Sequence, residues 1–137
     1  MSHSEERGST LRSQWFSFDS SAFAWVVPHG GAKEIATARV LSGPQDAACD
    51  FLDLSIIPPG ADIGIHTHGT QEEEYYIIVS GLGEMHVDGQ TFSVRSGDVI
   101  RNRPGGTHGL RNTGEHEILL VVIQVPTQHP SLPDPEA

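Results

Sequence analysis

Apolar residues occur along this chain in short bursts of four to nine residues, separated by turn-forming segments such as PHGG, PPGAD and RSGD. The bursts cover residues 21–27, 36–41, 51–57, 74–79, 83–87, 91–94, 98–101 and 117–125. Bursts of this length and spacing are typical of antiparallel strands in a sandwich or barrel. Between two of them, Asp88-Gly89 suits the tight turn of a two-residue hairpin. The only segment with some helical character, residues 43–49, is short and uncapped, so the pattern predicts an all-β fold with little helix.

The two ends of the chain differ from this central pattern. Residues 1–13 are rich in Ser, Glu, Arg and Gly, and residues 126–137 contain four prolines, which cannot pair within a central strand. The 137 residues suffice for one globular domain and are too few for two. We therefore predict a flexible tail at 1–13, one β-barrel domain at 14–126 and a Pro-rich tail at 127–137.

Charge and composition narrow the classes of partner. Eighteen acidic residues outweigh eight basic ones, and the resulting net charge of −10 repels phosphate backbones, so we expect no nucleic-acid partner. The single cysteine, Cys49, excludes an internal disulfide. The polar N-terminus lacks the apolar segment of a secretory signal, and no apolar run is long enough to cross a bilayer. We therefore expect a cytoplasmic protein with no membrane partner.

Three histidines and one glutamate stand at positions suited to a metal site. His66 and His68 are two residues apart, so on a strand both imidazoles point to one face and could supply half of a transition-metal site. Glu74 opens the next apolar burst and offers an anionic oxygen, and His108 follows a Pro-Gly-Gly turn. Taken alone, an H-x-H pair can also be two surface histidines beside a turn.

The spacing around these residues resembles the first sequence motif of the cupin superfamily. That motif runs Gly, five residues, His-x-His, a short loop, Glu, six residues and Gly. The residues at these places are Gly60, His66, His68, Glu74 and Gly81. The loop between His68 and Glu74 has five residues where the family has three or four, so Glu73 or Glu72 stays open as an alternative carboxylate ligand. Glu74 is preferred, because only Glu74 keeps the six-residue spacing to the final glycine and thus the strand register.

A second segment, residues 97–112, resembles the second cupin motif. That motif runs Gly, five residues, Pro-x-Gly, two residues, His, three residues and Asn. The matching residues are Gly97, Gly105, His108 and Asn112. The proline is displaced, since Arg103 occupies its place and Pro104 follows. Both motifs occur in order, and the resemblance covers roughly residues 50–125.

The resemblance implies a single-domain cupin barrel, a double-stranded β-helix of the jelly-roll kind. It also implies one divalent metal held by His66, His68, Glu74 and His108. Nitrogen and oxygen ligands without a thiolate suit Fe(II), Mn(II), Ni(II), Co(II), Cu(II) or Zn(II) and do not select among them. Small cupins commonly pair through their N-terminal strands, so the resemblance further implies a homodimer.

Further pocket residues are predicted where a residue shares a strand face with a candidate ligand, or is the more apolar of two neighbours on the intervening hairpin. They are Tyr76, Ile78, Met85 and Leu110. The hydroxyl of Tyr76 could donate to a bound oxygen, or Tyr76 could only form part of the wall. Arg101 and Arg103 share a strand face and could bind a carboxylate or phosphate at the metal mouth. Alternatively, these two arginines only balance an acidic surface.

Three function classes are compatible with such a site. The first is a metal-dependent oxygenase, most simply a dioxygenase, that acts on a small organic molecule. The second is a metal-dependent isomerase, cyclase or lyase acting on a small molecule or sugar. The third is a binding or sensing protein without catalysis, since one barrel hosts many chemistries.

Overall fold

The computed structural model describes residues 13–43, 45 and 47–127. In this part of the chain, ten strands and one short 3₁₀ turn follow one another. They are β1 (Ala24–Val26), η1 (Pro28–Gly30), β2 (Ile35–Ser42), β3 (Phe51–Ile57), β4 (Asp62–Thr67), β5 (Glu72–Ser80), β6 (Leu82–Val87), β7 (Gln90–Arg95), β8 (Val99–Asn102), β9 (Thr107–Asn112) and β10 (Ile118–Pro126). The fold is all-β, as the sequence predicts.

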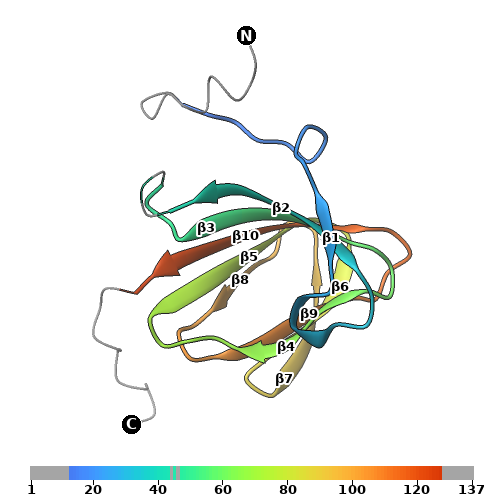
Figure 1. The fold of residues 1–137 in the computed structure, drawn as a ribbon. Helices are drawn as coiled ribbons and strands as arrows, with labels where there is room; N and C mark the ends of the chain where they lie inside the picture. The colour runs from blue at the N-terminus through green and yellow to red at the C-terminus, as the bar shows by residue number, and fades with distance from the viewer. Residues whose placement is uncertain (1–12, 44, 46, 128–137) are drawn as a thin grey trace.

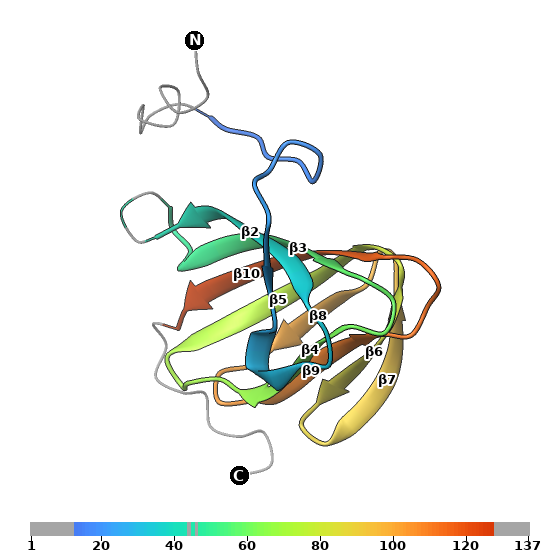
Figure 2. The same cartoon turned by 45° about the vertical axis from the view of Figure 1, so that its right-hand side comes forward.

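The strands form two sheets that face each other (Figures 1 and 2). The larger sheet has the order β1-β2-β3-β10-β5-β8, and the smaller has the order β4-β9-β6-β7. Every recorded pairing is antiparallel. Because β10 lies between β3 and β5, the last strand joins the two halves of the larger sheet. This arrangement is a single-domain jelly-roll barrel.

The apolar bursts predict most of the strands, and β3 occupies the predicted range of residues 51–57. Two strands, β4 and β9, carry too many glycines and polar residues to appear as bursts. Within the described part of 43–49 the chain forms turns and bends and no helix. The flexible tails predicted at 1–13 and 127–137 lie almost wholly outside the described residues.

The predicted hairpin at Asp88-Gly89 joins β6 to β7. Both residues have positive φ, 49° and 83°, and Val87 pairs with Gln90 across the turn. Positive φ at both central positions defines the mirror-image turn whose twist matches paired strands. Asp88 also binds β9, because its carboxylate accepts from the backbone N–H of Thr107 at 2.9 Å. The hairpin is thereby attached to the strand that carries His108.

The apolar core lies between the two sheets. It includes Ile57, Ile78, Met85, Leu110, Ile118 and Leu120, each at most 1% exposed. Burial of side chains of this size stabilises the fold by about 1.5–3 kcal/mol each. No helix in the described residues is long and apolar enough to span a membrane.

Candidate metal centre

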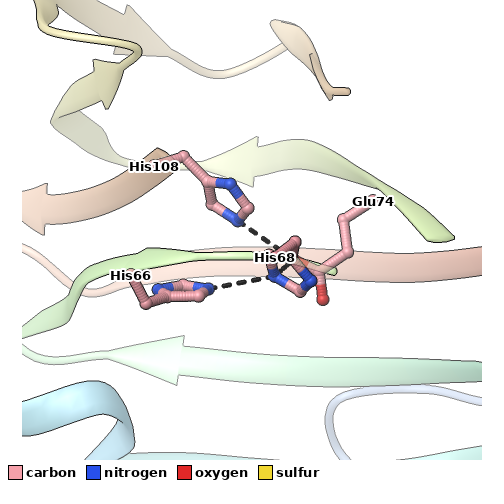
Figure 3. A group of neighbouring side chains, drawn as sticks. All are labelled: His66, His68, Glu74 and His108. Atoms are coloured by element: carbon pink, nitrogen blue, oxygen red, sulfur yellow. Dashed lines mark hydrogen bonds and ion pairs between the residues drawn. The ribbon is translucent and has the colours of Figure 1, made fainter. Parts of the chain in front are cut away.

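Four side chains from both sheets converge inside the barrel (Figure 3). His66 lies in β4, and His68 directly follows the end of that strand. Glu74 lies in β5 and His108 in β9. One nitrogen from each imidazole and one oxygen of Glu74 all lie within 4.8 Å of one another. Glu74 is 5% exposed and His108 is 1% exposed. The structure thus brings together the four candidate ligand residues that the sequence predicts.

A bulge in β4 turns His66 into the barrel. Between β4 and β9, Ile63 pairs with Leu110 but His66 pairs with His108, so β4 contains one extra residue. An extra residue reverses the alternation of faces, which lets both Ile63 and His66 face the interior. The Nδ1–H of His66 donates to the carbonyl oxygen of Gly64 within this bulge at 2.7 Å. The lone pair of His66 therefore lies on Nε2, which points at the other ligands.

The electrostatic environment keeps His66 neutral. Burial lowers the pKa of His66 to about 4, against the opposing effect of the hydrogen bond to Gly64. The positive charges that nearby histidines would carry contribute a smaller part of this lowering of the pKa. A neutral imidazole is the form that binds a metal ion.

A turn between β8 and β9 positions His108. The N–H of Gly106 donates to the carbonyl of Arg103 at 3.0 Å, with Pro104 second and Gly105 third in the turn. Gly105 has a φ of +74°, as the third position of a type II turn requires. The displaced proline thus fits the turn. Gly105 and Gly106 also bond the backbone of the His68–Gly69 loop at 3.0 Å, which ties two ligand-bearing segments together.

Glu74 and Glu73 point in opposite directions. Oε1 of Glu74 lies 3.0 Å from Nε2 of His68 and 3.1 Å from Nε2 of His108. The carboxylate of Glu73 instead accepts from Arg101 at 2.7 Å and from the hydroxyl of Tyr75. Burial opposes its ionisation, but these hydrogen bonds outweigh it and hold the pKa of Glu73 below its usual value. The alternative ligand Glu73 is thus placed outside the cluster.

The spacing of the four donors fits a single ion. Two ligand atoms that each lie about 2.1 Å from an ion, at right angles to each other, are about 3.0 Å apart. Nε2 of His66 and of His68 are 3.0 Å apart, which matches the two contacts of Glu74. Without an ion, two imidazole lone pairs at this distance would repel unless one nitrogen carried a proton. The cluster could therefore hold a metal ion.

A cavity of about 230 Å³ opens beside this cluster. His66, Glu74 and Tyr76 lie in its wall, and the rest of the wall comes from β1, η1, β2, β3, β4 and β10. The ring of Tyr76 meets His108 edge to face, with centroids 5.3 Å apart. Burial, with a smaller effect from the charge of Glu74, raises the pKa of Tyr76 well above its usual value. Its hydroxyl therefore keeps its proton.

The remaining predicted pocket residues lie elsewhere. Ile78, Met85 and Leu110 are fully buried in the core and do not line the cavity. Arg101 bonds Glu73 on the outer face of β5 and β8, and Arg103 is exposed in the turn before β9. Neither arginine lines the cavity.

Several cavity residues were not predicted from the sequence. His29 in η1 stacks on His66, and the inner faces of β2 and β3 contribute polar side chains. These polar residues are Thr37, Arg39, Asp53 and Ser55. The two residues on each strand are two positions apart, so the alternation of strand faces places them correctly on one face. However, polar residues on a strand usually face solvent, so nothing in the local pattern marks these four as interior.

Comparison with known proteins extends these observations. The sequence profile of the cupin domain family matches residues 53–124. The chain is 35% identical over 98 residues to an oxalate-binding protein of Thermotoga maritima, covering 69% of this chain and 79% of that protein. It is 32% identical over 73 residues to a 5-nitrosalicylic acid 1,2-dioxygenase of a Bradyrhizobium species, covering 53% of this chain but only 34% of that enzyme. Among solved structures, a predicted oxalate decarboxylase from Thermotoga maritima superposes with a TM-score of 0.77 at 24% identity, covering 83% of this chain and all of that one.

Proposed function

This chain belongs to the cupin family, and from that membership we propose that it is a metal-dependent dioxygenase that acts on a small organic molecule. The observation that carries the proposal is the convergence of three imidazole nitrogens and one carboxylate oxygen, with His66 and Glu74 of this cluster in the wall of a cavity. Four protein ligands leave coordination positions open on a five- or six-coordinate ion. The similarity to the nitrosalicylate dioxygenase supports this reaction class.

His66, His68, Glu74 and His108 would hold the ion, which we propose to be Fe(II), Mn(II), Ni(II), Co(II), Cu(II) or Zn(II). When bound, such an ion supplies Lewis acidity, and Fe, Cu or Mn also supplies one-electron chemistry with dioxygen.

The chain's own residues orient the ligands and enclose the substrate. The carbonyl of Gly64 holds the imidazole of His66 in the tautomer that presents Nε2. The protonated hydroxyl of Tyr76 is a hydrogen-bond donor for an oxygen of the substrate. Ile63 and Val122 add apolar wall, which limits water and strengthens the electrostatic contacts inside.

A second candidate function is the binding of a small carboxylate without turnover. The name of the oxalate-binding relative favours it, because that relative matches more of this chain than the dioxygenase does. This candidate needs the same four ligands and the same cavity, so it differs from the first only in whether bound ligand is transformed.

Metal analysis combined with oxygen uptake tests the proposal. The purified protein is analysed for metal, loaded with Fe(II), and given small phenolic acids and small dicarboxylates in an oxygen-electrode cell. Substrate-dependent oxygen consumption that is lost in Glu74→Gln supports the dioxygenase. Turnover without oxygen consumption would instead assign the protein to the isomerase, cyclase or lyase class. Binding of a carboxylate without turnover by any metal form supports the second candidate.

We also propose that the protein is a homodimer. The outer face of the larger sheet carries apolar side chains, including Val79 at 44% and Val99 at 63% exposed. Trp25 in the edge strand β1 is 59% exposed. An apolar outer face of this kind is typical of an interface between subunits. Light scattering after gel filtration is expected to give twice 14.8 kDa, and a value of 14.8 kDa refutes the dimer.

A further inference from the structure

Arg39 is a cation placed inside the same cavity as two of the proposed metal ligands. It extends from the inner face of β2, and the cavity wall that contains it also contains His66 and Glu74. Among the described residues that line this cavity, no other lysine or arginine occurs. The side chain of Arg39 is 53% exposed, so it stands toward the open side and the ligand cluster stands deeper.

Two contacts hold the guanidinium of Arg39 in place. Its Nε–H and one Nη–H donate to the two carboxylate oxygens of Asp53, its partner on β3, at 2.9 and 3.1 Å. Its central carbon lies 4.0 Å from the centroid of the Phe51 ring. A planar guanidinium held by a bidentate carboxylate and an aromatic face has lost most of its rotational freedom already. A ligand that binds it therefore incurs a smaller entropic cost.

The guanidinium still has donors to offer. It carries five N–H groups, and Asp53 takes two of them. Next to it on the same two strands, the hydroxyls of Thr37 and Ser55 bond each other at 3.1 Å and line the cavity. The wall between Arg39 and the ligand cluster is thus lined by groups that suit a polar ligand.

Charge counting shows what kind of ligand fits. Of the charged groups that line the cavity in the described structure, Arg39 carries one positive charge, and Asp53 and Glu74 carry one negative charge each. Histidines that are neutral add nothing. The protein groups therefore give the cavity a net charge of one negative, and a divalent ion changes it to one positive. A ligand with one net negative charge would balance the loaded site, whereas a doubly charged phosphate ester would overbalance it.

We propose that Arg39 is the anion-recognition residue of this cavity, and that its ligand is a small organic acid. The carboxylate of this acid is bound by Arg39, and a second oxygen group at the other end faces the metal site. The cavity of about 230 Å³ restricts the ligand to a small molecule. This inference rests on the proposed function, because the second oxygen group needs the metal.

The test compares Arg39→Gln with a matched control. Arg95→Gln removes an exposed arginine from β7, outside the cavity. Each protein is loaded with Mn(II), its metal content and melting temperature are measured, and calorimetric titrations follow. The probes are glycolate, lactate and pyruvate, which each carry one negative charge and a second oxygen group, and each acid is paired with its neutral amide. Arg39→Lys, which keeps the charge and loses the planar fork, serves as a second variant if Arg39→Gln melts at a lower temperature.

The expected result is a loss of tenfold or more in the affinity of Arg39→Gln for at least one acid, with its amide unaffected. The affinity of Arg39→Lys for the acid should lie between those of Arg39→Gln and the unmodified chain, and the affinity of Arg95→Gln should equal that of the unmodified chain. Equal acid affinity in Arg39→Gln and the unmodified chain, at equal metal content, overturns the inference alone. A loss of acid affinity in Arg101→Gln instead of Arg39→Gln also overturns it, as does a preference of the unmodified chain for phosphate esters. Absence of metal in the unmodified chain overturns the proposed function, and the two-point binding mode with it.

Discussion

The imidazole of His29 lies parallel to that of His66, with the ring centroids 3.5 Å apart and the planes 7° from parallel. His29 has a φ of 54°, which is unusual for a residue with a side chain. Its backbone carbonyl approaches β4 so closely that a Cβ on Gly64 would lie 2.1 Å from it. The glycine of the bulge in β4 therefore allows η1 to bring a fourth histidine to the site. His29 covers one face of a proposed ligand and restricts how that ligand can rotate.

Removal of this stacking partner should weaken metal binding. We expect His29→Ala to raise the metal dissociation constant by about 2- to 12-fold, which corresponds to the ~0.5–1.5 kcal/mol of an aromatic pair. Competition with a chromophoric chelator measures this constant. The exposed His116 provides the matched control, since His116→Ala should leave it unchanged. Equal affinities in the two variants would mean that the stack does not orient His66.

Loss of a single imidazole from the centre should remove the metal without unfolding the barrel. We expect His66→Ala and His108→Ala each to weaken metal binding by about 100-fold or more, because each removes a direct ligand. Mass spectrometry of the dialysed protein gives the metal content, and circular dichroism reports the fold. Full metal occupancy in either variant would refute the assignment of that histidine.

The two neighbouring glutamates should behave differently. Glu74→Gln removes the negative charge from the ligand cluster, so we expect a strong loss of metal. Glu73→Gln changes only the outer contact with Arg101 and Tyr75, so metal content should stay normal. Because the side chain of Arg101 in that contact is 47% exposed and that of Glu73 only 13% exposed, the free energy of unfolding should fall by about 1 kcal/mol. The reverse order of metal loss would make Glu73 the ligand.

The metal-free protein should lose stability as the pH falls from about 6.5 to about 4. The pKa of His66 is about 4 in the folded chain, against 6.5 for a histidine free of such an environment. Between these values the unfolded chain binds a proton that the folded chain does not bind, so acid favours unfolding. Urea denaturation with EDTA at several pH values measures the slope. His66→Gln should show a shallower slope over this window, and an unchanged slope would contradict the low pKa.

Much of this protein can be predicted from local patterns. The turn at Asp88-Gly89 and the strand at residues 51–57 follow from residue types that suit one backbone geometry. His66 and His68 share a side because neighbouring positions on a strand alternate. Glu74 is distinguished from Glu73 by its spacing to Gly81, and the structure places these two carboxylates on opposite sides of β5. Each of these inferences needs only short-range geometry or motif spacing.

The orientation of β2 and β3 is decided by the tertiary structure. Thr37, Arg39, Asp53 and Ser55 line the cavity, while the apolar Leu54 lies on the opposite face of the sheet. The usual preference for apolar residues in the interior would predict the reverse orientation. That prediction fails because the interior at this place is a cavity with a polar wall. Only the packing of the two sheets determines which face of β2 and β3 lines the cavity.

By itself, the sequence determined the all-β class and the hairpin, because these depend on the order and spacing of nearby residues. It also indicated the four candidate ligands, through the resemblance of two segments to the cupin motifs. The tertiary structure alone decided that His29 stacks on His66 and that Arg39, rather than Arg101, lines the cavity. The physical reason is that His29 and Arg39 reach the site through contacts between segments that are distant along the chain. The bulge in β4 and the pairing of β2 with β3 create those contacts, and neither leaves a periodic signal in the sequence.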